Sequence, residues 1–183
     1  MGETMKLGLK LLVITMVASF ALALTQMITE EPIRVQAVKA ENEARAVVLE
    51  GAEEFEAVEV PSETYPNILE VHKGFKNGEL IGYTIKATSR GYGGQLTVIA
   101  GIDAGGNISG VRVAQHSETP GLGARVLEPS FYEQFTGKSA AAQLGSDSIS
   151  AISGATVSSK AVTSAVNAAI ELYKAELETG GGN

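Results

Sequence analysis

The sequence predicts an α+β fold: an antiparallel sheet packed with a C-terminal helix, preceded by one N-terminal transmembrane helix. Three observations support this fold class. The chain begins with an apolar run, four short segments with strand-like patterns follow, and the last part holds a long segment with helical periodicity. The length of 183 residues leaves room for one globular unit and a short accessory segment.

The apolar run Leu7–Ile28 contains a single charged residue, Lys10. As a helix it is about 33 Å long, which is enough for the hydrocarbon core of a membrane, about 30 Å. A cleaved signal peptide is the alternative, because Ala21-Leu22-Ala23 has the small-x-small form of a cleavage site. The apolar run continues past Ala23, and this favours a membrane anchor.

Charges at the two ends of this helix predict its orientation. Lys6 and Lys10 lie at its start, and Glu30 and Glu31 follow its end. Because basic residues tend to stay on the cytoplasmic side, we expect a cytoplasmic N-terminus. A single pass would then leave the rest of the chain outside the cytoplasm.

Residues 29–66 are expected to connect the anchor to the globular part. After Pro32, the segment Ile33–Val48 mixes valines with Ala, Glu, Lys and Arg, which indicates an amphipathic helix that leaves the membrane. Residues 50–66 are acidic and contain Pro61 and Pro66, which indicates a connector.

The middle of the chain predicts two hairpins. The four expected strands are Ile68–Phe75, Leu80–Ala87, Leu96–Ile102 and Ile108–Ala114. Asn77-Gly78 separates the first two strands, and Asn-Gly readily takes the positive φ angles of a type I′ turn. Residues 104–107, Ala-Gly-Gly-Asn, separate the last two. Four consecutive strands joined by such turns imply an antiparallel sheet.

The C-terminal part is expected to be helical. Residues 124–136 suggest short helical turns, and Val157–Leu177 suggests a long helix with an apolar face. The expected domains are a cytoplasmic N-terminus (1–6), the transmembrane helix (7–28), the amphipathic helix with its connector (29–66), the globular domain (67–178) and a disordered tail (179–183).

Composition excludes several classes of function. The formal net charge is −7, so no nucleic-acid partner is expected. The absence of cysteine excludes disulfides, thiolate metal sites and a cysteine nucleophile. His72 and His116 are the only histidines in the sequence, so no metal centre is expected. The sequence has no P-loop and no Gly-x-Ser-x-Gly motif, and no catalytic residue is predicted.

Residues 116–123, His-Ser-Glu-Thr-Pro-Gly-Leu-Gly, are not needed to build a sheet. Pro120-Gly121 fits the two central positions of a type II turn. A tight turn that leaves an edge strand is the simpler interpretation. A carboxylate, hydroxyl groups and two glycines so close together would also let a flat ligand approach the backbone.

Residues 150–160 are the second such segment, and they precede the predicted long helix. Ser153 is a candidate N-cap, which would put Thr156 at the third helical position. A hydroxyl there suits a phosphate held against the helix N-terminus. An ordinary start of a helix, rich in Ser and Thr, is the alternative.

Both segments carry a resemblance to a known family. The stretch from Ser153 to Ser159, Ser-Gly-Ala-Thr-Val-Ser-Ser, resembles the flavinylation motif of the FMN-binding domain family, and Glu118-Thr-Pro-Gly-Leu-Gly123 is similar to its second signature. Together with one membrane helix, these motifs resemble the RnfG subunits of ion-translocating ferredoxin:NAD oxidoreductases, with NqrC subunits as near relatives. In this family a flavin transferase joins FMN through its phosphate to the motif threonine.

The resemblance implies a covalent phosphoester between FMN and Thr156. The implied cofactor-binding residues are Thr156, Ser153, Gly154, Ala155, Val157, Ser158, Ser159, Glu118, Thr119, Gly121, Leu122, Gly123, Tyr92 and Gly93. The hydroxyls of Ser153, Ser158 and Ser159 could donate to the phosphate. Family members commonly have Asp three residues before the motif serine, whereas Ser150 holds that place here. The role of that acid in recognition by the transferase is therefore open.

The resemblance also implies a function and a location. The chain would be a membrane-anchored flavoprotein subunit of an ion-translocating complex in the prokaryotic cell membrane. It would relay electrons between ferredoxin and NAD without being catalytic alone. Its partners would be other membrane and peripheral subunits of an Rnf-type complex, the flavin transferase and membrane lipid. An NqrC-like subunit of a sodium-pumping quinone reductase and a secreted or pilin-like binding module are the alternatives.

Overall fold

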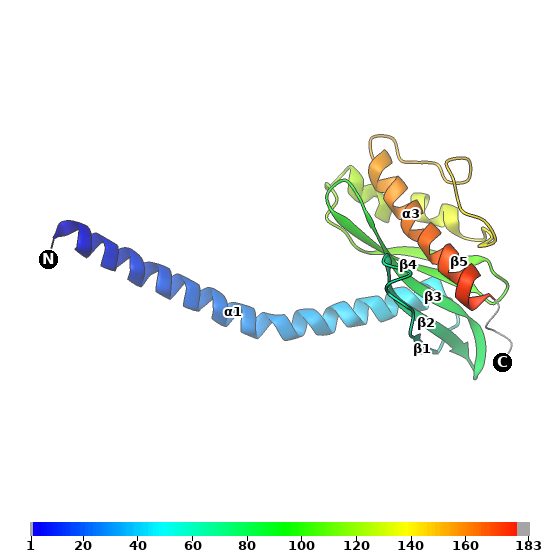
Figure 1. Ribbon diagram of the computed structural model, residues 1–183, viewed down its shortest axis with the longest axis horizontal. Coiled ribbons are helices and arrows are strands. Elements are labelled where there is room, and N and C mark those ends of the chain that lie inside the picture. The colour runs from blue at the N-terminus through cyan, green and yellow to red at the C-terminus, as the bar shows by residue number, and fades with distance from the viewer. Residues whose placement is uncertain (1, 179–183) are drawn as a thin grey trace. The chain divides into compact units, whose positions relative to one another are not determined.

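The computed structural model describes residues 2–178, so the predicted tail 179–183 lies outside the described residues (Figure 1). The helices and strands are α1 (Glu3–Val48), β1 (Glu54–Val58), β2 (Ile68–Lys76), β3 (Glu79–Arg90), β4 (Gln95–Asp103), β5 (Ile108–Gln115), the short turns η1 (Gly123–Leu127), α2 (Pro129–Tyr132) and η2 (Glu133–Phe135), then α3 (Thr156–Leu172) and a final π-helical turn η3 (Tyr173–Leu177). The chain divides into two compact units, Met1–Ala40 and Glu41–Asn183.

The five strands form one antiparallel sheet in the order β1-β2-β3-β4-β5. The four strands and the α+β class expected from the sequence are confirmed. Asn77 and Gly78 have φ angles of 50° and 81°, as a type I′ turn requires. The strand β1 was not predicted: it lies within the expected connector and pairs with β2, Glu54 opposite Phe75 and Val58 opposite Val71.

The helix α3 covers one face of the sheet and contacts β3 and β4 (Figure 1). Its apolar stripe packs against side chains such as Ile85, Val98 and Ile102, and all of these are buried. Edge-to-face contacts between Phe131 and Phe135, and between Tyr83 and Tyr173, extend this core. The core therefore holds the start of α3 at a fixed place beside the sheet.

The helix α1 is longer than expected. It continues through Pro32, so the two helices expected on either side of this proline are one helix. A proline removes one hydrogen bond and favours a bend, but it does not have to end a helix. Within residues 2–178, Met5–Glu30 is the one helical segment long and apolar enough to cross a membrane; its mean hydropathy is 2.2 and none of it is buried.

The last turn of α1 lies in a groove lined by glycines on the other face of the sheet. An added Cβ at Gly101 would come within 2.2 Å of the Val48 carbonyl oxygen, and one at Gly74 within 2.4 Å of Leu49 Cδ2. Each of the strands β2 to β5 contributes one residue to this glycine groove, namely Gly74, Gly82, Gly101 and Gly110. Because α3 covers the first face and the end of α1 covers the second, β4 is buried on both faces.

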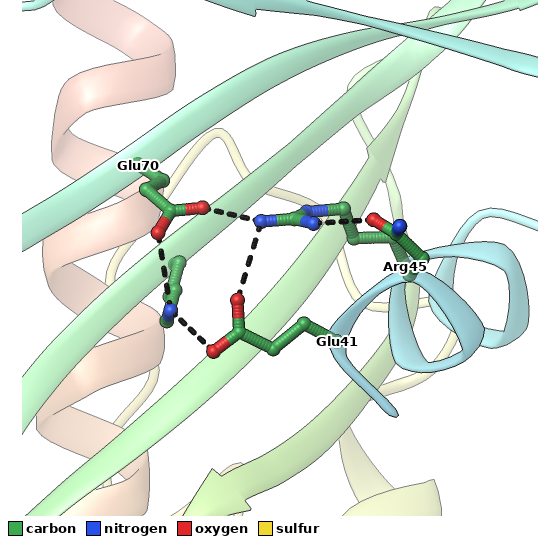
Figure 2. Close-up of polar contacts among 5 residues, drawn as sticks. Glu41, Arg45 and Glu70 are labelled. Carbon is green, nitrogen blue, oxygen red and sulfur yellow. Dashed lines mark hydrogen bonds and ion pairs between the residues drawn. The ribbon is translucent and has the colours of Figure 1, made fainter. Parts of the chain in front are cut away.

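Four charged side chains fix the end of α1 to this second face (Figure 2). Arg45 pairs with Glu70 of β2 and lies 3.7 Å from Glu41. The Lys86 amine of β3 lies 2.7 Å from Glu41 and 3.1 Å from Glu70. Arg45 and Lys86 are buried, and each of them contacts both carboxylates, so neither buried cation is left unpaired.

The charges of this cluster act on the pKa of Glu70. Burial by itself raises this pKa, but the hydrogen bond and charge of Lys86 and the charge of Arg45 lower it, and the pKa lies below its ordinary value. A carboxyl whose pKa falls on folding stabilises the folded state above its unfolded pKa, about 4.3 for Glu. That stabilisation is lost as the pH falls through the folded pKa.

We therefore expect the thermal unfolding midpoint of the wild-type chain to fall between about pH 5 and pH 3. Glu70→Gln should start from a lower midpoint at neutral pH and fall less over the same range. Glu54→Gln, which alters an exposed carboxylate of β1, is the matched control and should follow the wild type. Circular dichroism measures all three, and equal pH slopes for Glu70→Gln and wild type would contradict the assignment.

Candidate functional site

A cavity of about 490 Å³ lies where residues 92, 118–123 and the start of α3 meet. It is lined by Tyr92, Glu118, Thr119, Leu122, Gly123, Gly154, Ala155, Thr156, Val157 and Ser158. All ten belong to the set predicted from the sequence, whereas Gly93, Gly121, Ser153 and Ser159 of that set do not line the cavity. The two segments that the sequence singled out are thus brought together at one place.

The start of α3 differs from the expectation. Ala155 is the N-cap residue instead of Ser153, and Thr156 is the first helical residue instead of the third. The reason is Gly154, whose φ of 81° turns the chain before the helix begins. No side chain caps the helix. The backbone N–H groups of its first three residues, 156–158, have no acceptor among the described residues.

The hydroxyl groups near this helix start have different partners. Ser158 donates to Glu118 Oε2 at 2.7 Å. Ser159 donates to the Ala155 carbonyl at 2.9 Å and accepts from the Ile152 N–H. The sequence had suggested that both serines could donate to a phosphate; in this structure each hydroxyl donates within the protein. Thr156 is exposed, and within residues 2–178 its hydroxyl has no hydrogen-bond partner.

The carboxylate of Glu118 is part of the cavity wall. The side chain is buried; its Oε2 accepts from Ser158 and from the Gly93 N–H at 3.4 Å, and its Oε1 has no partner among the described residues. An added Cβ at Gly91 would come within 2.0 Å of Oε1. Gly91 was missed by the sequence reasoning; the signal was its place in Gly91-Tyr92-Gly93-Gly94, where glycine leaves room for the carboxylate.

The loop that carries Glu118 contains the predicted type II turn. Gly121 has a φ of 75°, and the Leu122 N–H donates to the Thr119 carbonyl at 3.2 Å. This turn places Leu122 and Gly123 on the cavity wall beside α3. The expected turn is confirmed, and it also forms part of the cavity.

Comparison with known proteins identifies this arrangement. Residues 91–171, which include every lining residue of the cavity, match the FMN-binding domain family. The chain is 43% identical to the G subunit of the Na⁺-translocating ferredoxin:NAD⁺ oxidoreductase complex of Acetobacterium woodii, over 92% of this chain and 91% of that protein. It is 34% identical to the G subunit of the ion-translocating oxidoreductase complex of Methanosarcina acetivorans, over 95% and 96% of the two chains.

The chain belongs to the RnfG family of ion-translocating oxidoreductase complexes. A solved structure supports the fold of this RnfG-family chain: the C subunit of the Na⁺-translocating NADH-quinone reductase from Parabacteroides distasonis has a TM-score of 0.52 at 16% identity, over 77% of this chain and 96% of the other. The family match also establishes an FMN-binding domain within a flavoprotein subunit.

The cavity of this RnfG-family chain suits FMN. Its volume is within the range of about 300–1,000 Å³ that is typical of cofactor sites. The uncapped start of α3 offers N–H groups and the positive end of the helix dipole to a phosphate. Tyr92, Leu122 and Val157 are exposed apolar side chains on the cavity wall and could border a flat ring. Glu118 also has a carboxylate oxygen, Oε1, without a hydrogen-bond partner among the described residues. A residue that only packs against its neighbours would not bring such an atom to the cavity.

Proposed function

We propose that FMN is attached through its phosphate to Thr156 Oγ1, in a phosphoester formed by a flavin transferase. The observation that carries this proposal is the position of Thr156. This exposed threonine is the first residue of α3, a helix without a side-chain cap whose first residues line the cavity. Ser158 and Ser159, the neighbouring hydroxyls, are occupied by Glu118 and Ala155. Ser153, the other serine of the motif, does not line the cavity. Thr156 is therefore the residue of this motif best able to take up the phosphoryl group.

Charge also favours attachment at this place. A phosphodiester keeps one negative charge, and a charge at a helix N-terminus is stabilised by roughly 0.3–1 kcal/mol. The N–H groups of the first turn of α3 would hold the phosphate, while Leu122 and Tyr92 would border the ring. Gly154, Ala155, Val157, Thr119 and Gly123 complete the wall. Gly93, Gly121, Ser153 and Ser159 are the sequence neighbours of lining residues.

We further propose that the protein relays electrons between ferredoxin and NAD within a membrane complex of Rnf type, in which the other subunits are its partners. When bound, FMN supplies the capacity to accept and donate electrons. The described residues provide a flavin site joined to a membrane anchor. They contain no βαβ unit that could bind a dinucleotide, because the sheet is wholly antiparallel. The name of the Acetobacterium woodii relative, which belongs to a ferredoxin:NAD⁺ oxidoreductase complex, supports this proposal.

The test is to express the chain with and without a flavin transferase and to measure the intact mass. We expect the mass to rise by one FMN less one water only when the transferase is present, and the denatured protein to stay yellow. The purified flavin-bearing protein should not oxidise NADH by itself. An unchanged mass would refute the attachment, and rapid NADH oxidation by the purified protein alone would refute the relay.

The topology follows from the anchor. We propose that residues 7–28 cross the cell membrane once, within its lipid, with residues 1–6 in the cytoplasm and the FMN-binding domain (67–178) outside. The chain has no cysteine, so Ser62→Cys introduces a single thiol at an exposed position. A membrane-impermeant maleimide should label this thiol in intact cells. Labelling only after lysis would mean the opposite orientation.

A further inference from the structure

The cavity wall holds a buried carboxylate side chain that the attachment of FMN does not require. Glu118 is the only charged side chain among the described residues that line the cavity, and it is 5% exposed. Within residues 2–178, no Lys or Arg forms an ion pair with it. Its hydrogen-bond partners are neutral: the Ser158 hydroxyl and the Gly93 N–H.

The surrounding glycines show that the protein makes room for this carboxylate. A Cβ at Gly91 would come within 2.0 Å of Oε1, and one at Gly123 within 2.5 Å of Oε2. A buried carboxylate without a cation disfavours folding, and Oε1 has no hydrogen-bond donor among the described residues. The hydrogen bonds to Oε2 account for the position of this side chain, but they do not require that it carry a charge.

We infer that Glu118 lowers the reduction potential of the flavin bound in this cavity, an inference that rests on the proposed function. An electron that enters the site comes from a reduced redox partner, which is oxidised. The electron adds negative charge to the cofactor until a proton follows from solvent. A fixed carboxylate in surroundings of low dielectric constant repels this added charge. The Ser158 hydroxyl and the Gly93 N–H hold the carboxylate in place while leaving its charge uncompensated.

Glu118→Gln removes the charge of the side chain and keeps its shape. Glutamine has nearly the same shape and keeps a carbonyl oxygen that can accept from Ser158 and Gly93, but it carries no charge. The full chain, loaded by the transferase and purified in detergent, is titrated by spectroelectrochemistry. We expect a shift to more positive potential of about 30 mV for a two-electron couple, which is a tenfold change in the equilibrium.

Three further variants make the result decisive. Glu56→Gln removes an exposed charge on β1 and should leave the potential unchanged. Ser158→Ala removes the hydrogen bond but keeps the charge, so it should not reproduce the positive shift. Thr119→Lys adds a positive charge on the cavity wall and should also raise the potential, which shows whether the bound flavin responds to a charge on this wall.

The outcomes distinguish this inference from the proposed function. In-gel fluorescence after denaturation reports whether each variant carries covalent flavin, independently of its potential. A wild-type chain without flavin would refute the attachment itself. Fully loaded Glu118→Gln with the wild-type potential would overturn the role of Glu118, as would an equal positive shift in Ser158→Ala.

Discussion

Thr156→Ala is expected to abolish covalent flavin. Thr156 is exposed at the first position of α3, and the hydroxyls of Ser158 and Ser159 are occupied by Glu118 and Ala155. Ser153, the other serine of the motif, does not line the cavity, so no serine of the motif is placed to replace Thr156. Denaturing gel electrophoresis with in-gel fluorescence measures the effect directly. In the assembled complex, the variant should be present in normal amount while electron flow from ferredoxin to NAD collapses.

The matched control is Thr163→Ala, which removes a hydroxyl from the same helix. The Thr163 hydroxyl donates to the Ser159 carbonyl, and Thr163 does not line the cavity. This variant should keep its fluorescence. Undiminished fluorescence in Thr156→Ala would mean that another residue carries the flavin, and normal electron flow in that variant would mean that this flavin lies off the path.

Gly101→Ala is expected to destabilise the domain strongly. The new methyl group would lie 2.2 Å from the Val48 carbonyl oxygen and 2.5 Å from Ser109 Oγ. Backbone from two elements would have to move apart, which we expect to cost about 3 kcal/mol of unfolding free energy, a fall of roughly 10 °C in the thermal midpoint. Thermal unfolding of the chain in detergent, followed by circular dichroism, measures this.

Gly105→Ala is the control for this variant. An added Cβ there would meet only side-chain atoms, the nearest at 3.2 Å in Asp103. The midpoint of Gly105→Ala should stay within a few degrees of the wild type. A similar midpoint for Gly101→Ala would contradict the packing of the last turn of α1 in the glycine groove.

Local signals in the sequence were enough to predict most of the sheet. Asn77-Gly78 has the chemistry of its turn, and apolar residues mark the strands β2 to β5, so their positions were found to within a few residues. The strand β1 was missed because Glu54 and Glu56 make it look like an acidic connector. Its place in the sheet depends on pairing with β2, and the residues of β1 alone do not predict this pairing.

The site was predicted in composition but not in detail. The residues around Thr156 and Glu118 were identified through a motif, whereas the cap was placed at Ser153 because serine is a good cap in general. Gly154 overrides that preference by turning the chain. The hydrogen bond from Ser158 to Glu118 joins residues 40 positions apart. Such a contact depends on how α3 packs on the sheet, so local sequence patterns do not predict it.

The connectivity of the sheet has a consequence for the order of folding. Every strand pairs with its neighbour in sequence, so β1 to β5 can form by successive closure of short loops, a route with low entropic cost. The helix α3 follows all five strands in the sequence and docks on β3 and β4. Since half of the cavity wall belongs to residues 154–158, the cofactor site does not exist until α3 has been synthesised and has docked on the sheet.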